Sequence, residues 1–482
     1  MRPAYAPVTS PPSTQPSTPN LAPRDVAGLA AELVAYHARF APLFPRPEQR
    51  HGALRYLQGQ MLDLERKAIE PLAHAVEGGN VQALQQFISQ SPWDADALLA
   101  AHQACVGETL GDPESGVLII DGCDFPKQGT HSVGVARQWC GALGKRANCQ
   151  ASVLACYASD HGHTLVDRRL YLPDKWFTPA YAARRRRCGV PPEIRFQTQP
   201  ELAWAMLAEL HARGALPFRW VIIDEGFGQN PVLLDRIAAA GLCYFAEVPH
   251  TTRVWRERPA TGVPAGTGRG RRPQRVRVEA AAPAPVTVSA LAATLPPSAW
   301  SRHTLREGAK GPLVAEIARV RAVAVRDGLP GPAVWVVLRR SLDPQPDLKA
   351  FLSNAPADTP LATFVRLSAG RWPVERSIEE AKGELGLDHY EVRGWVGWHH
   401  HVTLTFLAHH FLVRARLRLG GKKPGPDRPT SPRPAASDAA PPDTGRGARA
   451  HPARLHPAAE SQRLLLPSQT HPPSSLRFVL TT

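Results

Sequence analysis

The stretch Val117-Leu-Ile-Ile-Asp121 decides the fold, because it is a short apolar run that ends in an acidic residue. A run of this kind is typical of a strand buried on both faces of a sheet. The pattern returns in Arg219-Trp-Val-Ile-Ile-Asp224, which again ends in an acid. Periodicity predicts further strands over Gln150–Tyr157, Thr164–Leu172 and Tyr244–Val248, and helices over Pro200–Arg213 and Val232–Ala240. This alternation predicts an α/β fold built on a mixed sheet.

Helical patterns flank this sheet on both sides. Apolar residues recur at helical spacing from Asp25 to about Thr109, so residues 24–110 are predicted to form an N-terminal helical region, a candidate for DNA binding. Within it, Asp94 has the character of a helix start that leads into Ala95–Val106. Helix is predicted again over residues 361–418.

Three segments break these patterns. Residues 249–360 contain β-like runs and are predicted to form a β-rich insertion. Its basic, Gly- and Pro-rich part, Arg253 to Arg277, is predicted to be a mobile loop. Residues 1–23 are rich in Pro, Ser and Thr, and residues 419–482 in Pro, Ala and Arg. Neither end can bury a core, so both are predicted to be disordered.

The net charge narrows the classes of partner. The 482 residues include 57 Lys and Arg against 42 Asp and Glu, which gives a formal charge of +15. An apolar content of 43% supports a sizeable core and argues against a collagen-like or wholly disordered chain. The basic surplus points to a polyanion, nucleic acid before an anionic membrane, with a solvated basic surface as the alternative.

The cysteines and the apolar runs indicate the compartment. The number of cysteines, seven, is odd, and no pair has C-x-x-C spacing, so small buried hydrophobes in a reducing cytosol are expected rather than disulfides or a zinc ribbon. No run approaches the roughly 20 apolar residues of a membrane span. We therefore expect a cytoplasmic protein with no membrane partner, associated with the nucleoid when it binds DNA.

Two strand-end acids are the first candidates for chemistry. Asp121 and Asp224 each follow an apolar strand, and in open α/β sheets the active crevice lies outside the carboxyl ends of the strands. A carboxylate there is placed to bind a hard cation, whereas a turn or a helix cap is the plainer interpretation. Asp124 and Glu225 lie close enough in sequence to be alternatives.

A third acid falls on a predicted helix. In Arg371-Trp-Pro-Val-Glu375-Arg-Ser-Ile-Glu379-Glu380-Ala-Lys382, a rotation of about 100° per residue puts Arg371, Glu375 and Lys382 on one face. Pro373 fits only the first turn, so Arg371 is expected at the cap. A solvated face with i,i+4 pairing is the alternative. The case for function needs all three acids, because two Mg²⁺ ions about 3.5–4 Å apart require a few converging carboxylates.

At these residues the sequence resembles the DDE transposases of bacterial insertion sequences, which carry a ribonuclease-H-like catalytic domain. The family signature Tyr-x-x-Arg-x-x-x-Glu-x-x-x-x-x-x-Lys falls on Arg371, Glu375 and Lys382, with Ser368 at the Tyr position. A second acid and a Thr usually follow the first Asp; here Gly122 and Cys123 do, which leaves Asp121 as the main candidate. Similarity extends from about Phe40 to Arg418 and includes the segments Ile120–Gly129, His131–Gly141, Asn148–Gln150, Leu170–Pro173 and Gly386–Trp395.

The resemblance implies a ribonuclease-H-like catalytic domain in two parts, residues 115–248 and 361–418. It implies a DNA transposase in which Asp121, Asp224 and Glu375 bind two Mg²⁺, with Mn²⁺ as a substitute. Water would cut the phosphodiester at each element end, and the freed 3′-hydroxyl would attack the opposite strand or target DNA. The implied partners are double-stranded DNA, with terminal inverted repeats, and a second copy of the chain in a synaptic dimer.

Several side chains near these segments are candidates for DNA contact. The phosphate-binding candidates are Arg371, Lys382, Lys127, Lys145, Arg146, Arg184 and Arg185, and Trp255 is a candidate for base stacking. For the run Arg184–Arg187 a solvated face is the alternative. His399–His401 with His409 and His410 suggest a metal, but no cysteine supports a ligand set, so packing is favoured. Trp395 and Trp398 are expected in the core.

Two further hypotheses remain open. A decayed or domesticated copy would bind element ends without cutting, as the Gly122-Cys123 and Ser368 departures allow. An RNA-directed nuclease on the same fold is the other alternative, and the Arg-Glu-Lys spacing argues against it.

Overall fold

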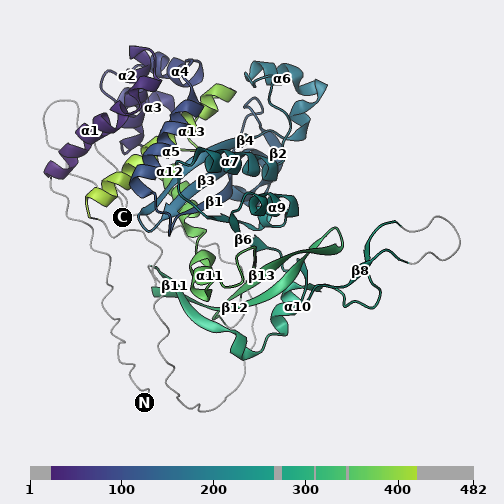
Figure 1. Cartoon of the computed structure of the whole chain (residues 1–482). Helices are drawn as coiled ribbons and strands as arrows, with labels where there is room; N and C mark the ends of the chain where they lie inside the picture. Colours follow the sequence, from purple (N-terminus) through teal and green to yellow (C-terminus); the bar gives the residue numbers. More distant parts are fainter. Residues whose placement is uncertain (1–22, 265–273, 309–310, 344–346, 421–482) are drawn as a thin grey trace, which may run out of the picture.

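One large mixed sheet organises the chain (Figure 1). The computed structural model describes residues 23–264, 274–308, 311–343 and 347–420. Twelve strands join in this sheet, and its main path runs β10-β7-β12-β13-β14-β6-β5-β1-β3-β2, with β11 paired to β12 and β4 to β3. Helices cover both faces of its central part, so the predicted mixed α/β fold is confirmed.

The centre of the sheet is parallel. Strands β1 (Val117–Pro126), β5 (Trp220–Ile223) and β6 (Cys243–Val248) lie side by side in the same direction. Every residue of β5 and β6 is buried, which explains why their sequences are apolar except for Glu247. On the other side of β1 lie β3 (Lys145–Ser159), β4 (Gly162–Tyr171) and β2 (Ala136–Cys140), all antiparallel to their neighbours.

Most of the strands between residues 249 and 360 continue this same sheet. Strand β14 (Leu348–Ser353) pairs with β6 in the antiparallel direction. Beyond β14 the sheet adds β13 (Leu329–Ser341), β12 (Gly311–Arg326), β11 (Ser301–Gly308), β7 (Arg253–Trp255) and β10 (Val286–Thr287). The long hairpin β12–β13 forms the lower lobe in Figure 1, beside the short helix α10 (Val288–Ala293).

The prediction of a mobile loop over Arg253–Arg277 is wrong for the first residues of this segment. Strand β7 belongs to the sheet, and Trp255 is only 3% exposed, with its indole N–H donated to the carbonyl of Pro283. Burial excludes the base stacking predicted for this tryptophan. The next part forms a two-stranded ribbon of β8 (Thr261–Gly262) and β9 (Arg277–Val278), and residues 265–273 lie outside the described residues.

The N-terminal helices pack around the last helix of the chain. They are α1 (Pro23–Ala38), α2 (Pro47–Met61), α3 (Ile69–Ala75), α4 (Val81–Ser89) and α5 (Ala95–Leu110), and α13 (Trp395–Arg418) contacts α1, α2, α4 and α5. Asp94 caps α5 by accepting the backbone N–H groups of Asp96 and Ala97, as predicted. Figure 1 shows this bundle at one end of the sheet.

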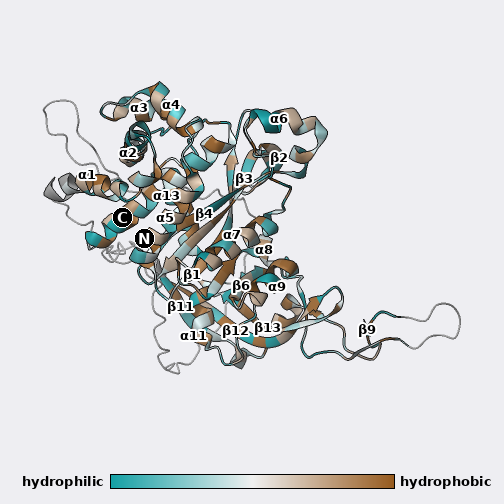
Figure 2. Ribbon diagram, turned by 45° about the horizontal axis from the view of Figure 1, so that its top comes forward, coloured by the Kyte–Doolittle hydropathy of each residue, from teal (hydrophilic) through white to brown (hydrophobic). Residues whose placement is uncertain are grey.

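Each face of the sheet has its own core. Helices α7 (Gln199–Arg213), α8 (Glu225–Gly228) and α9 (Pro231–Ala239) cover the face that carries Leu118 and Ile120. Helices α11 (Leu361–Ser368), α12 (Trp372–Gly383) and α13 cover the face that carries Ile119 and Cys123. The exposed helix α6 (Ala182–Arg187) is hydrophilic and peripheral (Figure 2).

The histidines of α13 are packing residues. His400 bonds to the carbonyls of Ile88 and Trp93, and His401 bonds to the hydroxyl of Tyr56. His409 and His410 are also fully buried and bonded to hydroxyl groups. Trp398 lies in the core as predicted, whereas Trp395 is only partly buried. All seven cysteines are buried thiols, in agreement with their predicted role as small hydrophobes.

The two ends predicted to be disordered lie almost wholly outside the described residues; helix α1 already begins at Pro23, and α13 ends at Arg418. None of the helices in the described ranges combines the length and the apolar character needed to cross a membrane.

Candidate active site

Asp121 and Asp224 lie next to each other where the parallel pairing of β1 with β5 ends. Strand β1 itself continues to Pro126, so Asp121 lies inside its strand and not at its end, where the sequence predicted it. Ile120 of β1 is aligned with Ile223 of β5, so the aspartates that follow them are at the same level of the sheet. Asp224 also caps α8, and its Oδ1 accepts the backbone N–H of Phe227 at 3.0 Å. Its second carboxylate oxygen is not engaged by that cap. The sequence prediction of two acids at one edge therefore agrees with the register.

A third carboxylate, Glu247, lies in the same row and was missed in the sequence analysis. Ile223 of β5 is aligned with Ala246 of β6, which places Glu247 beside Asp224. Its side chain is 11% exposed, and Lys349 of the neighbouring strand β14 donates to its Oε1 at 2.9 Å. The available signal was an acid inside the otherwise apolar strand Cys243–Val248, at the end that faces the crevice.

Helix α12 brings Glu375 to this row from the covering layer. Arg371 is the N-cap and Pro373 lies in the first turn, as its missing N–H predicts. Val374 and Ala381 pack into the core and fix the helix against the sheet. Glu375 lies in the first turn, and its side chain is 57% exposed, so it faces the solvent side of the row.

The guanidinium of Arg371 joins the carboxylates. Its Nη2 lies 3.0 Å from Oδ2 of Asp121 and 3.5 Å from Oε1 of Glu375, so one nitrogen bridges two of the predicted ligands. Its Nη1 lies 3.4 Å from Oε2 of Glu247. The structure thus brings Asp121, Asp224 and Glu375 to one place, with Arg371 among them.

The pKa values show how charge is distributed in this cluster. Burial raises the pKa of Asp121, although Arg371 works against the rise. Burial also raises the pKa of Asp224, and the charge of Asp121 adds to it. Burial opposes ionisation of Glu247 as well, but Lys349 and Arg371 outweigh it and lower the pKa. Burial therefore outweighs the positive charge near the two aspartates, whereas Lys349 and Arg371 outweigh burial at Glu247.

This donor set fits a hard divalent cation in its chemistry. It offers only carboxylate oxygens, which Mg²⁺ prefers, and its aspartates repel each other. In the described part of the chain, no three His, Cys, Asp or Glu side chains converge closely enough to hold a metal ion. A nitrogen of Arg371 lies instead between Asp121 and Glu375, where the cation would share their oxygens.

Asp124 and Glu225, the two alternative acids in the sequence, differ in their surroundings. Oδ2 of Asp124 accepts the backbone N–H of Gly141 at 2.6 Å, and its carbonyl accepts from Lys382 at 3.1 Å. Glu225 is exposed in the first turn of α8. Ser368, at the position of the family tyrosine, is buried and bonded to the carbonyl of Val365.

A hairpin beside the site carries exposed aromatic and basic side chains. Strand β2 and the start of β3 are joined by η2 (Gly141–Leu143), and Trp139 is opposite Arg146 in the pairing. Trp139 is 63% exposed, and Lys145 and Arg146 are also exposed. Side chains alternate along β3, so Arg146 lies on the same face as Leu154, the partner of Asp121. This face therefore carries both the acids and Arg146, whereas Lys145 alternates to the other face.

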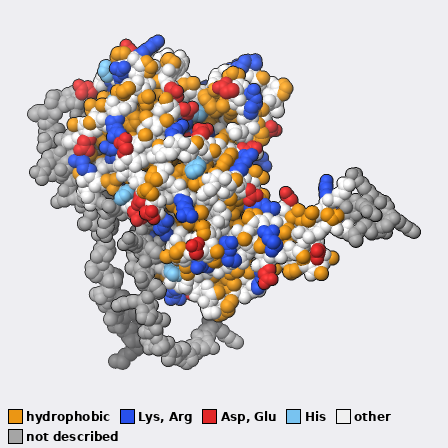
Figure 3. Space-filling model, viewed as in Figure 1, with side chains coloured by type: hydrophobic (Ala, Val, Ile, Leu, Met, Phe, Trp, Pro, Cys, Tyr) orange, Lys and Arg blue, Asp and Glu red, His pale blue; other side chains and the backbone are white. Residues whose placement is uncertain are grey.

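The remaining basic candidates differ in exposure. The guanidinium of Arg184 lies over the ring of Tyr181 and that of Arg185 over the ring of Phe177, both partly buried. The ammonium of Lys127 lies 3.5 Å from the ring centre of Tyr390, and burial lowers its pKa to about 8. Figure 3 shows further Lys and Arg side chains over the lobe formed by β11, β12 and β13.

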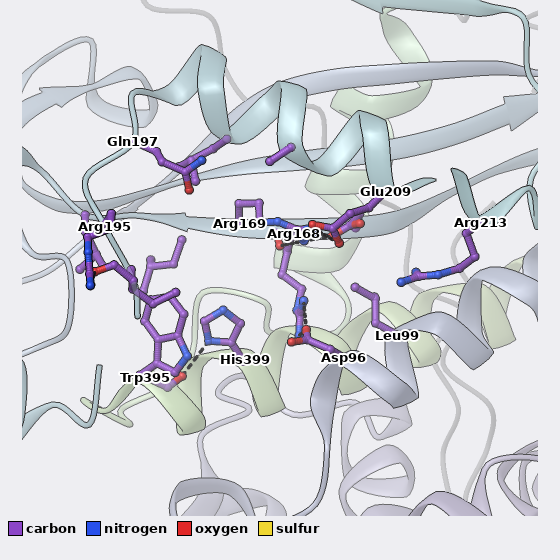
Figure 4. Close-up of a pocket in the computed structure, with 16 residues that line it drawn as sticks. Asp96, Leu99, Arg168, Arg169, Arg195, Gln197, Glu209, Arg213, Trp395 and His399 are labelled. Atoms are coloured by element: carbon purple, nitrogen blue, oxygen red, sulfur yellow. Dashed lines mark hydrogen bonds and ion pairs between the residues drawn. The ribbon is translucent and has the colours of Figure 1, made fainter. Parts of the chain in front are cut away.

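Figure 4 shows a separate pocket, which none of the acids of the row lines. Its volume is about 320 Å³, and its wall includes Arg168, Arg169, Trp395 and His399. Asp96 is paired with Arg168, so this acid is neutralised within the chain. None of the predicted catalytic residues lines this pocket.

Comparisons with known proteins identify the family of the chain. Residues 39–312 match the family described as DDE superfamily endonuclease, and this span includes Asp121 and Asp224 but ends before α12. The chain is 28% identical over 210 residues to a probable transposase for insertion sequence element IS701 from Microchaete diplosiphon. The match covers 43% of this chain and 51% of that protein, so the chain spans about half the length of this relative. The resemblance predicted from the strand-end acids is confirmed, and the chain belongs to the DDE superfamily of endonucleases.

Proposed function

We propose that the chain is a DNA transposase of an insertion sequence, with Asp121, Asp224 and Glu375 as its catalytic carboxylates. The observation that carries the proposal is the row of strand-end acids that Arg371 ties to Glu375. Family membership implies nuclease activity, and the family is typically metal-dependent. The identity of the DNA substrate and the transfer step belong to the proposal.

The carboxylates would hold two Mg²⁺, or Mn²⁺ in their place. When bound, the pair of ions supplies an activated water at neutral pH and stabilises the leaving oxygen. Asp121 and Asp224 share one edge of rigid strands, so their oxygens are held in place without the aid of a flexible loop. Glu375 enters from α12 on the more open side, where a phosphodiester can approach.

The cations around the row would bind the DNA backbone. The ammonium of Lys382 lies beside Asp124, between the acids and the hairpin. Arg146 and Lys145 extend the basic surface along the same edge, and Trp139 can stack on a base or wedge into a groove. Arg146 lies eight positions from the partner of Asp121 along β3, which is roughly 26 Å and corresponds to about eight base pairs.

The other side chains predicted to contact DNA are less available, because aromatic rings already contact them. Arg184 and Arg185 are partly occupied by aromatic rings, whereas Arg186 and Arg187 on the same helix are exposed. Lys127 is held by Tyr390, so we leave it out of the proposed DNA surface. A second copy of the chain, binding the second element end, would complete a synaptic dimer.

The test uses purified protein and a DNA fragment that carries the inverted repeats flanking its coding region. With Mg²⁺, the native chain is expected to cut at the repeat ends, and Asp224→Asn to bind the same DNA without cutting. Binding without cleavage by the native chain would favour a decayed or domesticated DNA-binding protein. Preferential cutting of an RNA–DNA hybrid would favour an RNA-directed nuclease.

A further inference from the structure

Glu247 is a carboxylate of the site to which the family signature gives no role. It lies in register with Asp224 but points to the opposite end of the Arg371 guanidinium from Asp121. Its two oxygens have different partners, because Lys349 holds Oε1 and Arg371 Nη1 lies near Oε2. Its side chain is only 11% exposed, so water does little to weaken these pairs.

The guanidinium of Arg371 is therefore shared between two kinds of acid. Nη2 contacts Asp121 and Glu375, which are proposed metal ligands, whereas Nη1 contacts Glu247, which is not. An arginine keeps its charge at every physiological pH, so it cannot leave this cluster by losing a proton. A divalent cation between Asp121 and Glu375 would repel the guanidinium at short range.

On this basis we propose that Glu247 is a positioning residue that anchors Arg371 beside the acid cluster. The inference rests on the proposed function, because it concerns the same metal site. Asp121 and Glu375 would hold the cation in place of Nη2, and Glu247 would keep its contact with Nη1. The arginine then remains at the edge of the site, where its free nitrogen can face a phosphate.

Lys349 makes this anchor rigid. It lies on β14, the strand next to β6, and its ammonium donates to Oε1 of Glu247 at 2.9 Å. The carboxylate is thus fixed from the side away from the site, so its second oxygen is directed at Arg371. Without Glu247, Arg371 would pair only with Asp121 and Glu375, the proposed metal ligands. It would then compete more strongly with the cation for their oxygens.

The test is a double-mutant cycle read out as Mn²⁺ affinity, by paramagnetic resonance of the free ion. Glu247→Gln in the native background is expected to weaken Mn²⁺ binding roughly threefold or more. In the Arg371→Met background the same change is expected to have little effect, since there is no arginine left to anchor. An equal loss in both backgrounds would show that Glu247 acts directly on the ion and would overturn the proposal.

Two further measurements separate this inference from the proposed function. Asp235→Asn removes a carboxylate of α9 that pairs with Arg326 of β12 and not with Arg371, and it controls for net charge. Asp121→Asn must weaken Mn²⁺ binding; if it does not, the proposed metal site fails. In that case, the anchoring of Arg371 by Glu247 is tested in metal-free protein with EDTA. The shifts of the urea unfolding midpoint for Glu247→Gln and Arg371→Met are expected to be less than additive in the double variant. Additive shifts would overturn the anchor.

Discussion

The guanidinium of Arg371 donates to Oδ2 of Asp121 at 3.0 Å, although the two residues are 250 positions apart in the chain. This contact joins the cap of α12 to the middle of β1. It therefore fixes how close Glu375 comes to the strand-end aspartates. Loss of the contact is expected to affect both the placement of the helix and the charge of the site.

The first prediction concerns Arg371→Lys. An ammonium keeps the charge but cannot bridge three carboxylates as a planar fork does. We expect end cleavage to fall about tenfold or more and the free energy of unfolding to fall by about 1–2 kcal/mol. Arg376→Lys is the matched control, because Arg376 has the same exposure but pairs with Glu379 and Glu380. Equal loss of cleavage in both variants would contradict the role given to Arg371.

The second prediction concerns the hairpin. Trp139→Ala is expected to weaken binding to end DNA by about 1–3 kcal/mol, the range for one stacked base. Arg146→Ala should reduce the salt dependence of binding by about one phosphate contact. The measurement is a fluorescence anisotropy titration at several salt concentrations. Leu143→Ala is the control from the same turn, at 46% exposure; a loss as large as that of Trp139→Ala would point to a general disturbance of the hairpin.

The third prediction concerns Lys127, whose pKa burial lowers to about 8 from an ordinary value of 10.5. Between pH 8 and pH 10.5, Lys127 of the unfolded chain still holds a proton that Lys127 of the folded chain has released. Stability should therefore rise with pH across this window, relative to Lys127→Met, by on the order of 2 kcal/mol. Urea unfolding at pH 7 to 10.5 measures the difference. Affinity for end DNA should be unchanged; a clear drop would restore Lys127 to the DNA surface.

The fourth prediction concerns Glu380, which is buried on α12 and bonded to Arg376, His409 and Arg416. Burial opposes its ionisation, but His409 and Arg416 outweigh it and hold the pKa well below its ordinary value of 4.5. Its stabilising contribution is therefore present above pH 4.5 and lost as the pH falls below it.

Glu380→Gln is expected to cost about 2–4 kcal/mol at pH 7, with the difference shrinking in acid. The neighbouring Glu379→Gln, at 70% exposure, should change stability by less than about 0.5 kcal/mol. Thermal or urea unfolding at pH 3 to 7 checks both variants. A difference that persists unchanged at pH 3 would contradict the ionised pair.

The strand-end acids and the α12 cap could be predicted because their signals are local. Val117-Leu-Ile-Ile-Asp121 and Arg219-Trp-Val-Ile-Ile-Asp224 carry both the strand and the acid in one run. Pro373 restricts where α12 can begin, which by itself predicts Arg371 at the cap. The register that aligns the two strands then follows from parallel packing.

Glu247 could not be placed in the same way, because its role depends on pairing between distant strands. Its strand, Tyr244–Val248, was predicted, but an acid inside an apolar run does not reveal its partners. Lys349 comes from β14, a strand that the sequence analysis did not identify. The burial of Trp255 and the contact of Lys127 with Tyr390 are likewise tertiary, since their sequences are basic or Gly-rich and indicate only a surface.

The central claim is that Asp121, Asp224 and Glu375 form one catalytic centre, and the most direct test is end cleavage by four proteins. The native chain, Asp121→Asn, Asp224→Asn and Glu375→Gln are each mixed with inverted-repeat DNA and Mg²⁺ after equal end binding has been confirmed. We predict cleavage by the native chain and a loss of at least about a thousandfold in each variant. Cleavage at the native rate by any of the three variants would contradict the claim.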